Sequence, residues 1–310
     1  MPRAAGIGMD LLREFEARIP RALARAISRA ESGRGGDLIR ALYPKVGRAT
    51  TVGLTGPPGV GKSTLASGLV RSARARGQSV GVVSVDPSSP FSHGALLGDR
   101  IRLAEHFTDE AVFIRSMASR GHLGGLAGAT ADAVLLMDAF GFDLVLIETV
   151  GVGQSEVAIA ELAQTTIVAL QPGSGDSIQV LKAGIMEIAD IFVVNKADHP
   201  MADLLRREIR SMMEMQHWPG WIPELVTTQA LEGKGIDELV SAIERHAAYL
   251  NETGEIERRR RDAFTHQVRQ LALGRLEQRL NDALKAQPRE DLDPYEAAEQ
   301  ILSKLGLGSQ

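Results

Sequence analysis

The sequence has no cysteine, and aromatic residues make up only 4% of its 310 residues. The absence of cysteine excludes disulfide bonds and thiolate metal sites, and it is compatible with a reducing compartment. No apolar run approaches the length of a transmembrane helix, and the first residues lack the hydrophobic core of a secretory signal. We therefore expect a cytoplasmic protein with no membrane partner.

An excess of positive charge is also missing. Lysine and arginine number 35 against 39 acidic residues, which gives a net charge of −4 and an isoelectric point near 6.0. Domains that bind nucleic acid are typically basic, so we expect no nucleic-acid partner. A composition of 44% hydrophobic and 24% charged residues suits a soluble globular protein. The length allows one α/β domain with helical extensions, or two small domains.

The strongest motif of the chain is a glycine-rich stretch that satisfies the phosphate-loop pattern G-x-x-x-x-G-K-[ST]. Residues 50–55 before it predict a strand, and residues 63–76 after it predict a helix. Such a turn points backbone N–H groups and the positive end of the helix dipole at one spot, which suits a polyphosphate. The loop residues are Gly56, Pro57, Pro58, Gly59, Val60, Gly61, Lys62, Ser63 and Thr64. We expect Lys62 to reach the β- and γ-phosphates and Ser63 to bind Mg²⁺.

Acidic residues follow two further predicted strands. Asp86 follows the strand 79–85, and Glu148 ends the strand 142–148 in the position of a Walker B acid. Because ligands bind at the carboxyl ends of parallel strands, both carboxylates are expected near Mg²⁺, although Asp86 also suits a plain Asp-Pro turn. Asp99 lies in the loop 91–102, where it either caps a helix over 99–106 or approaches the γ-phosphate and Mg²⁺.

A switch is expected directly after Glu148. Gly151 stands three residues further on, so that its backbone N–H can sense the γ-phosphate, and the loop 151–156 can respond to GTP. Gln154 is a candidate for orienting the attacking water. With Lys62, Glu148 and Asp99, it completes the predicted catalytic set.

The guanine-reading motif N-K-x-D follows the strand predicted at 191–194. Its members are Asn195, Lys196 and Asp198. The aspartate can accept from the ring N–H and the exocyclic amine of guanine, a pattern that adenine lacks, and the lysine stem packs on the base. The motif therefore favours GTP and GDP over ATP. The backbone contact to the guanine carbonyl is expected at Gln229, Ala230 and Leu231, where Gln229 departs from the usual serine.

Helices are predicted at both ends of the chain. The N-terminal pattern over 9–32, restarted at Pro20, alternates leucines with arginines and suits either a membrane-surface helix or a solvated arginine face over a buried leucine face. Helices are also expected over 235–250, 255–284 and 293–305. The arginines 258–261 read as a nucleic-acid arm or, because acids interrupt the region, as a solvated helix face.

The predicted fold class is α/β, a doubly wound and mainly parallel P-loop NTPase sheet with helical additions. We expect an N-terminal helical extension over 1–46, a GTP-binding domain over 47–250 and a C-terminal helical arm over 251–310. The C-terminal helices have too few partners to form a core of their own, so we expect them to mediate dimerisation.

Together these motifs resemble the bacterial MeaB/ArgK family of P-loop GTPases, which chaperone adenosylcobalamin-dependent acyl-CoA mutases. The resemblance covers about residues 22–250 and rests on the stretches 54–64, 85–89, 97–100, 148–156 and 195–198. It implies that Asp86, Asp99 and Glu148 are the Mg²⁺ and switch acids. It also implies a homodimer, slow GTP hydrolysis and control of cobalamin loading for methylmalonyl-CoA mutase or a relative such as 2-hydroxyisobutyryl-CoA mutase, together with its adenosyltransferase.

The segment 172–182 resembles the third switch of that family, which signals to the mutase. Gly173 and Gly175 predict a mobile turn after a strand, and Asp176 and Lys182 are candidate polar contacts to the partner. Their alternative roles are a helix N-cap and a solvated lysine. The predicted partner switch thus comprises Gly151, Gln154, Gly173, Asp176 and Lys182.

The motifs also bear on two other functions. An accessory ATPase or kinase of arginine and ornithine transport disagrees with the guanine motif. A metal-insertion GTPase shares the core, but such proteins often carry histidine- or cysteine-rich tracts, whereas this chain has no cysteine and seven scattered histidines.

Overall fold

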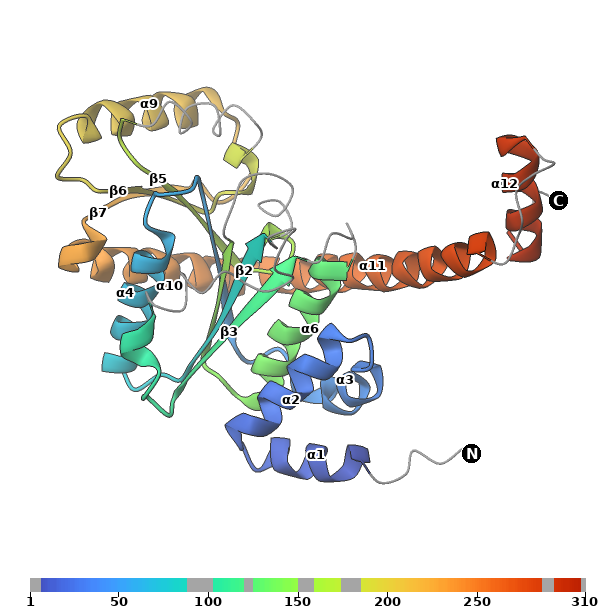
Figure 1. The fold of residues 1–310 in the computed structure, drawn as a ribbon. Helices are drawn as coiled ribbons and strands as arrows, with labels where there is room; N and C mark the ends of the chain where they lie inside the picture. The colour runs from blue at the N-terminus through green and yellow to red at the C-terminus, as the bar shows by residue number, and fades with distance from the viewer. Residues whose placement is uncertain are drawn as a thin grey trace.

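A seven-stranded sheet forms the centre of the molecule. The computed structural model describes residues 7–87, 103–119, 125–149, 159–173, 185–285 and 293–307. The strand order is β3-β2-β4-β1-β5-β6-β7, and every neighbouring pair is parallel (Figure 1). The strands are β1 (Thr50–Thr55), β2 (Val80–Pro87), β3 (Val112–Ser119), β4 (Leu144–Thr149), β5 (Thr165–Leu170), β6 (Ile191–Asn195) and β7 (Glu224–Thr228). The predicted doubly wound α/β fold is confirmed.

Helices cover both faces of this sheet. They are α1 (Ile7–Glu16), α2 (Pro20–Glu31), α3 (Gly36–Leu42), α4 (Lys62–Ala75), α6 (Gly125–Phe140), α9 (Ala202–Met215), α10 (Ile236–Thr253), α11 (Glu255–Lys285) and α12 (Pro294–Lys304). Short 3-10 turns are η1 (Tyr43–Lys45), η2 (Ala104–His106), η3 (Ile185–Ile188) and η4 (Ala230–Glu232). Helices α4 and α10 pack on one face, and α6, α9 and the N-terminal helices pack on the other (Figure 1).

The strands are apolar on both sides because both faces are covered, as is typical of parallel sheets. Val52, Leu54 and Leu146 join the core under α4 and α10, whereas their neighbours Val145 and Ile147 join the core under α6. Strand β1 lies between β4 and β5, so the carboxyl ends of these three strands meet at one edge. This edge is where a doubly wound sheet binds its ligand.

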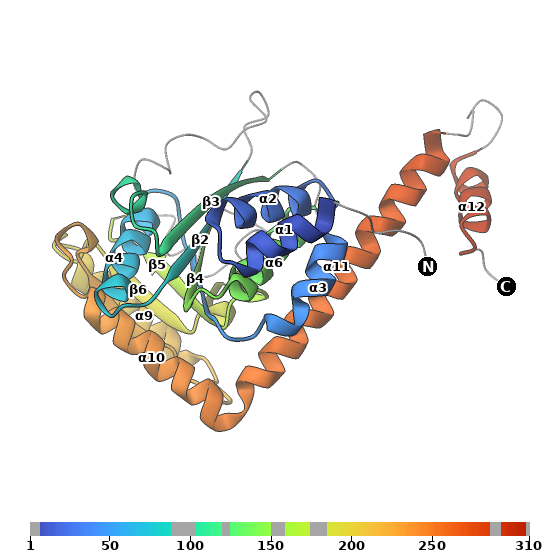
Figure 2. The same ribbon diagram turned by 90° about the horizontal axis from the view of Figure 1, so that it is seen from below.

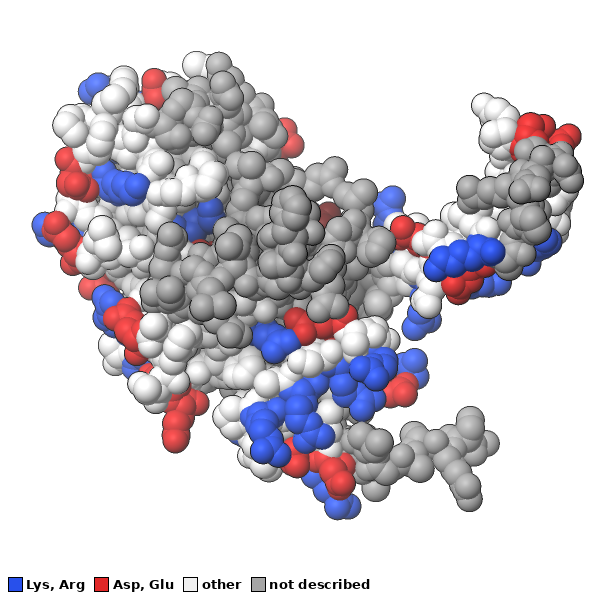
Figure 3. All heavy atoms as spheres, in the orientation of Figure 1, with Lys and Arg blue, Asp and Glu red and all other residues white. Residues whose placement is uncertain are grey.

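The N-terminal helices pack on α6. Phe15 of α1 meets Phe140 edge-on, with 5.1 Å between ring centres, and Leu23 and Ile27 of α2 are fully buried. Arginines gather on the outer face of these helices (Figure 3), and Arg21 is exposed there. The apolar face of α2 is thus taken up by the protein core, which supports the solvated arginine face rather than a membrane-surface helix. No helix within the described ranges is long and apolar enough to cross a membrane.

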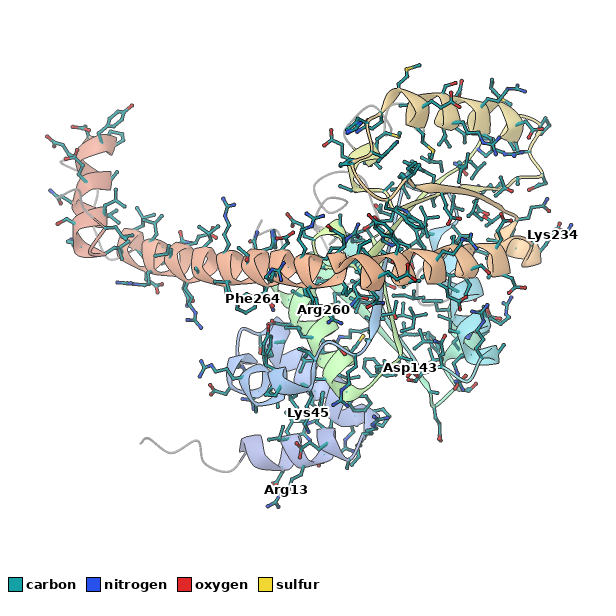
Figure 4. The ribbon with its side chains drawn as sticks, turned by 180° about the vertical axis from the view of Figure 1, so that it is seen from behind. Arg13, Lys45, Asp143, Lys234, Arg260 and Phe264 are labelled. Atoms are coloured by element: carbon teal, nitrogen blue, oxygen red, sulfur yellow. The ribbon has the colours of Figure 1, made fainter. Side chains whose placement is uncertain are left out.

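The beginning of α11 is attached to the amino end of the sheet. The guanidinium of Arg259 donates to both carboxylate oxygens of Asp190, at 2.8 and 2.6 Å, and to the carbonyl of Gln164 at 2.6 Å. Arg260 donates to the carbonyl of Gly47 at 2.8 Å. The interpretation of the arginine run as a solvated face is therefore wrong for Arg259, whose charge is paired with a buried acid. Beyond this anchor, α11 passes the N-terminal helices and carries α12 away from the sheet (Figures 2 and 4).

Two helical regions differ from what the sequence predicts. The described part of the helix expected over 99–106 is only the 3-10 turn η2. Helix α9 was not predicted, although Ala202, Leu205 and Ile209 have helical spacing and form its buried face. Its arginines and acids obscure that narrow stripe in the sequence, and the stripe is buried only because α9 packs on the apolar face of β5 and β6.

Neutralising Asp132 is expected to stabilise the fold near neutral pH. Burial between α6 and α11 raises the pKa of Asp132 to about 6, even though the side chain accepts from Gln267 at 3.0 Å. Since the folded pKa lies above the unfolded one, stability is lost as pH rises from about 4 through 6. Asp132→Asn should gain about 1–3 kcal/mol at pH 7.5 and little at pH 4.5. Denaturant unfolding at both pH values checks this, with the exposed Asp37→Asn as control; equal gains at both pH values would contradict it.

Candidate nucleotide site

The phosphate loop is built from backbone conformations that only glycine adopts easily. Gly56 has φ +138° at the end of β1, and a side chain there would collide with the carbonyl oxygen of Ala169 on β5. Gly61 has φ +93° as the N-cap of α4, and a Cβ there would lie 2.6 Å from Nδ2 of Asn195. The loop is therefore packed tightly between β1, β5 and the guanine motif, and its N–H groups lead into α4.

Lys62 is buried inside this loop, with 6% of its surface exposed. Its ammonium donates to the carbonyl of Gly56 at 2.6 Å and to that of Pro57 at 3.0 Å. The loop thus surrounds the charge of the lysine with its own carbonyl oxygens. A phosphate that entered the loop would offer the ammonium stronger, charged acceptors at the same position.

Ser63, at the start of α4, forms a hydrogen bond with Glu148, near the end of β4. The Ser63 hydroxyl donates to Oε1 of Glu148 at 2.7 Å, and the two residues are 3% and 2% exposed. A hydroxyl and a carboxylate oxygen are the hard ligands that Mg²⁺ prefers, so the pair fits a magnesium site. Strand pairing places Glu148 beside Ser84, and the backbone of Asp86 lies two residues closer to the carboxyl edge of β2. Asp99 lies outside the described residues.

Asn195 joins the guanine motif to the rest of the site. Its Oδ1 accepts from the Thr228 hydroxyl at 2.9 Å and from the Ala230 amide at 3.1 Å, and its Nδ2 donates to the carbonyl of Val60 at 2.8 Å. One buried side chain thereby connects β6, β7 and the phosphate loop. Of its three partners, Ala230 and Val60 belonged to the predicted nucleotide site and Thr228 did not.

Lys196 and Asp198 occupy the solvent side of this motif. Lys196 has φ +57°, and its ammonium donates to the carbonyl of Gly59 at 2.9 Å and to Oε1 of Gln171 at 2.6 Å. Asp198 is exposed. The pKa of Lys234, labelled just before the start of α10 in Figure 4, is raised by its hydrogen bond with Glu232 and, to a smaller extent, by the charge of Asp198. The sequence did not predict the contact of Gln171 with Lys196, because only the order of the strands brings the end of β5 to the lysine.

Existing hydrogen bonds reduce the number of backbone amides in residues 229–231 that could contact guanine. The amide of Gln229 donates to the carbonyl of Lys234 at 3.0 Å, and the amide of Ala230 donates to Asn195. Leu231 is 90% exposed, and its amide is the remaining candidate of the three. The unusual glutamine thus closes a small bridge with Lys234 rather than presenting its own N–H.

The predicted partner switch is described only at Gly173. This glycine has φ +74°, and a Cβ there would lie 3.3 Å from Cε1 of His199. Gly151, Gln154, Asp176 and Lys182 lie outside the described residues. The polypeptide leaving β5 therefore runs beside the guanine motif from the first residues of the predicted switch.

Comparison with known proteins decides the family. Residues 23–285 match the family model described as "Methylmalonyl Co-A mutase-associated GTPase MeaB". The chain belongs to the MeaB family. A relative from Pyrococcus horikoshii named "Putative GTPase" is 45% identical, with 92% of this chain and 94% of that protein covered.

Other MeaB relatives extend the comparison. "GTPase ArgK" of Escherichia coli is 37% identical over 75% of this chain and 72% of its own length. The mouse mitochondrial "Methylmalonic aciduria type A homolog" is also 37% identical, over 67% of this chain and 52% of its own length. A crystal structure titled "LAO/AO transport system kinase" covers 99% of this chain and 100% of its own, with a TM-score of 0.73 and 25% identity.

Membership of the MeaB family establishes the activity. The chain is a GTPase, which binds GTP and GDP, on a P-loop α/β fold. The order of its motifs along the sheet agrees with that activity, because the phosphate loop, Glu148 and Asn195 all stand at the carboxyl ends of β1, β4 and β6.

Proposed function

We propose that this GTPase controls the loading of adenosylcobalamin into an acyl-CoA mutase and protects or reactivates that enzyme. The observation that carries the proposal is the match of residues 23–285 to a family described by its association with methylmalonyl-CoA mutase. The mouse relative named for methylmalonic aciduria points the same way. Methylmalonyl-CoA mutase, or a relative such as 2-hydroxyisobutyryl-CoA mutase, is the partner, with its adenosyltransferase in the same assembly.

The residues of the site receive the following roles. Residues 56–64 cradle the phosphates, and Lys62 supplies a positive charge to the β- and γ-phosphates. Asn195, Lys196 and Asp198 hold guanine, with the loop 229–231 on its carbonyl side. Ser63 and Glu148 hold Mg²⁺, which neutralises phosphate charge when bound; their 2.7 Å contact supports this role. Asp86 and Asp99 complete the acids around the γ-phosphate, and Gln154 orients the attacking water.

The C-terminal arm is assigned to a homodimer. Large apolar side chains along α11 remain between 37% and 50% exposed. They are Phe264, Val268, Leu271, Leu273, Leu276 and Leu280. A groove of about 810 Å³ between α11, α6 and the N-terminal helices is lined by three of them, and Figure 4 shows Phe264 at this place. An apolar helix surface of this length favours a second copy as its cover. Light scattering that gave the mass of one chain would oppose this assignment.

Signalling to the mutase is assigned to Gly151, Gln154, Gly173, Asp176 and Lys182. The position of Gly173 beside His199, the residue that follows the guanine motif, supports a path between the nucleotide and this segment. A segment that touches the nucleotide site can take different arrangements with GTP and GDP, and a partner that prefers one of them changes GTP turnover.

The mutase is expected to stimulate GTP hydrolysis by this protein. Turnover is measured with and without methylmalonyl-CoA mutase and adenosylcobalamin. Asp176→Ala combined with Lys182→Ala should keep basal turnover within a few-fold and remove most of the stimulation, a coupling of about 1–3 kcal/mol. The matched control replaces Glu16 and Lys45, an acid–lysine pair 2.6 Å apart on the N-terminal helices. Absence of stimulation of the wild-type protein by any cobalamin-dependent acyl-CoA mutase would overturn the proposed function.

A further inference from the structure

Gln171 connects the end of β5 to the guanine motif. It is the first residue after β5, it is half-buried, and its Oε1 accepts from the ammonium of Lys196 at 2.6 Å. The same ammonium donates to the carbonyl of Gly59 at 2.9 Å. A lysine ammonium has three donors, so these two contacts determine where the lysine lies. One of them comes from the phosphate loop and the other from the segment that follows β5.

The backbone of Lys196 also needs such support. Its φ of +57° is left-handed, and among the described residues only one other non-glycine residue, Arg18, has a positive φ. This conformation costs an L-residue about 1 kcal/mol or more. It persists where surrounding contacts hold the residue in place, and the hydrogen bonds to Gly59 and Gln171 are such contacts.

The segment that follows β5 and the loop that carries the guanine motif also lie side by side at a second point. The backbone at Gly173 runs beside the ring of His199, which follows the guanine motif by one residue. The amide of His199 in turn donates to the carbonyl of Lys196 at 3.0 Å. The polypeptide leaving β5 therefore touches the guanine loop near both of its ends, at Lys196 and at His199.

We infer that Gln171 is a positioning residue of the guanine site, through which the segment after β5 sets how firmly GDP is held. This inference rests on the guanine site proposed above and names its regulation. Gln171 holds the ammonium, and the lysine stem then presents its apolar surface to the base. Movement of residues 171–173 away from Lys196 would free the lysine and speed GDP release. The neutral carboxamide suits this task, because a hydrogen bond between an ammonium and a neutral acceptor at a half-exposed position breaks more readily than an ion pair.

The test compares Gln171→Met with Gln171→Glu. Methionine keeps the length of the side chain but cannot accept from Lys196, whereas glutamate keeps the acceptor oxygen. The dissociation rate of a fluorescent GDP analogue should rise about 3- to 10-fold in Gln171→Met, the range for the net contribution of one hydrogen bond within a protein. It should stay within about 2-fold of wild type, or fall, in Gln171→Glu. Competition by inorganic pyrophosphate, which has no base to hold, should be equal in all three proteins.

A double-mutant cycle with Lys196→Ala separates this role from a structural one. In the Lys196→Ala background, Gln171→Met should change GDP dissociation less than about 2-fold, because the lysine it positions is gone. Additive effects, or equal losses of GDP and pyrophosphate binding, would overturn the inference. Wild-type GDP affinity in Lys196→Ala itself would instead overturn the proposed guanine site. If Lys196→Ala weakens GDP binding and Gln171→Met does not, the proposed guanine site is supported and only the inference about Gln171 fails.

Discussion

Lys62→Ala is expected to weaken GDP and GTP binding by about 10²–10³-fold, the effect of losing charged hydrogen bonds to phosphate. The lysine is buried in the phosphate loop, and its ammonium rests on the carbonyl oxygens of Gly56 and Pro57. Since the ammonium is already desolvated and held in place, it reaches the phosphates with little loss of conformational freedom. Titration calorimetry with GDP and with GTP measures the loss.

The same substitution removes a donor from two loop carbonyls, so a small loss of stability of about 1–2 kcal/mol is expected without nucleotide. Thermal unfolding of the nucleotide-free protein distinguishes this from loss of the fold. Lys45→Ala is the control, because Lys45 is an exposed lysine paired with Glu16 and far from the loop in sequence. Unchanged GDP affinity in Lys62→Ala, with the control also unchanged, would show that phosphates bind elsewhere.

Glu148→Gln is expected to lower GTP turnover by about 10²-fold or more while GDP affinity falls less than about 10-fold. The carboxylate is buried and bonded to the Ser63 hydroxyl at 2.7 Å. Glutamine keeps the size and the acceptor oxygen, so the contact to Ser63 survives and the negative charge alone is lost. A charge that acts on Mg²⁺ and on the reacting phosphate matters most in the transition state, where more charge develops.

Single-turnover hydrolysis and GDP titration in one buffer, at several Mg²⁺ concentrations, compare the two effects. The control is Glu224→Gln, which removes a carboxylate paired with Arg245 at the amino end of β7, away from the nucleotide site. It should leave GTP turnover and GDP affinity unchanged. Equal losses of turnover and of GDP affinity in Glu148→Gln would assign the glutamate to structure rather than to hydrolysis. If the Mg²⁺ dependence of GTP binding does not change, Ser63 and Glu148 do not hold the metal.

Thr228, Gln171 and Asp190 carry no motif, yet each holds a functional segment in place. Thr228 orients Asn195, Gln171 orients Lys196, and Asp190 binds the beginning of the arm through Arg259. Substitutions at these positions are therefore expected to affect nucleotide binding or the placement of the arm, although no nucleotide contact is assigned to them.

Local sequence is enough to predict the strands, the phosphate loop and the guanine motif. Thr50–Thr55 is β-branched and bounded by glycine, Pro20 begins α2, and Gly235 and Gly254 bound α10 with positive φ, so short-range sterics decide these elements. The motif residues Gly56 and Gly61 were also readable, because the left-handed conformations they adopt favour glycine wherever such a turn occurs.

Tertiary structure decided the rest, because the remaining contacts join residues far apart in the chain. The 2.7 Å contact of Ser63 with Glu148, the bond of Lys196 to Gln171 and the pairing of Arg259 with Asp190 depend on strand order and on which face each strand buries. Side chains with the same local pattern, such as Arg258 and Arg259, end in solvent and against a buried acid respectively. Burial and desolvation, which set these differences, exist only once the sheet and its helices have packed together.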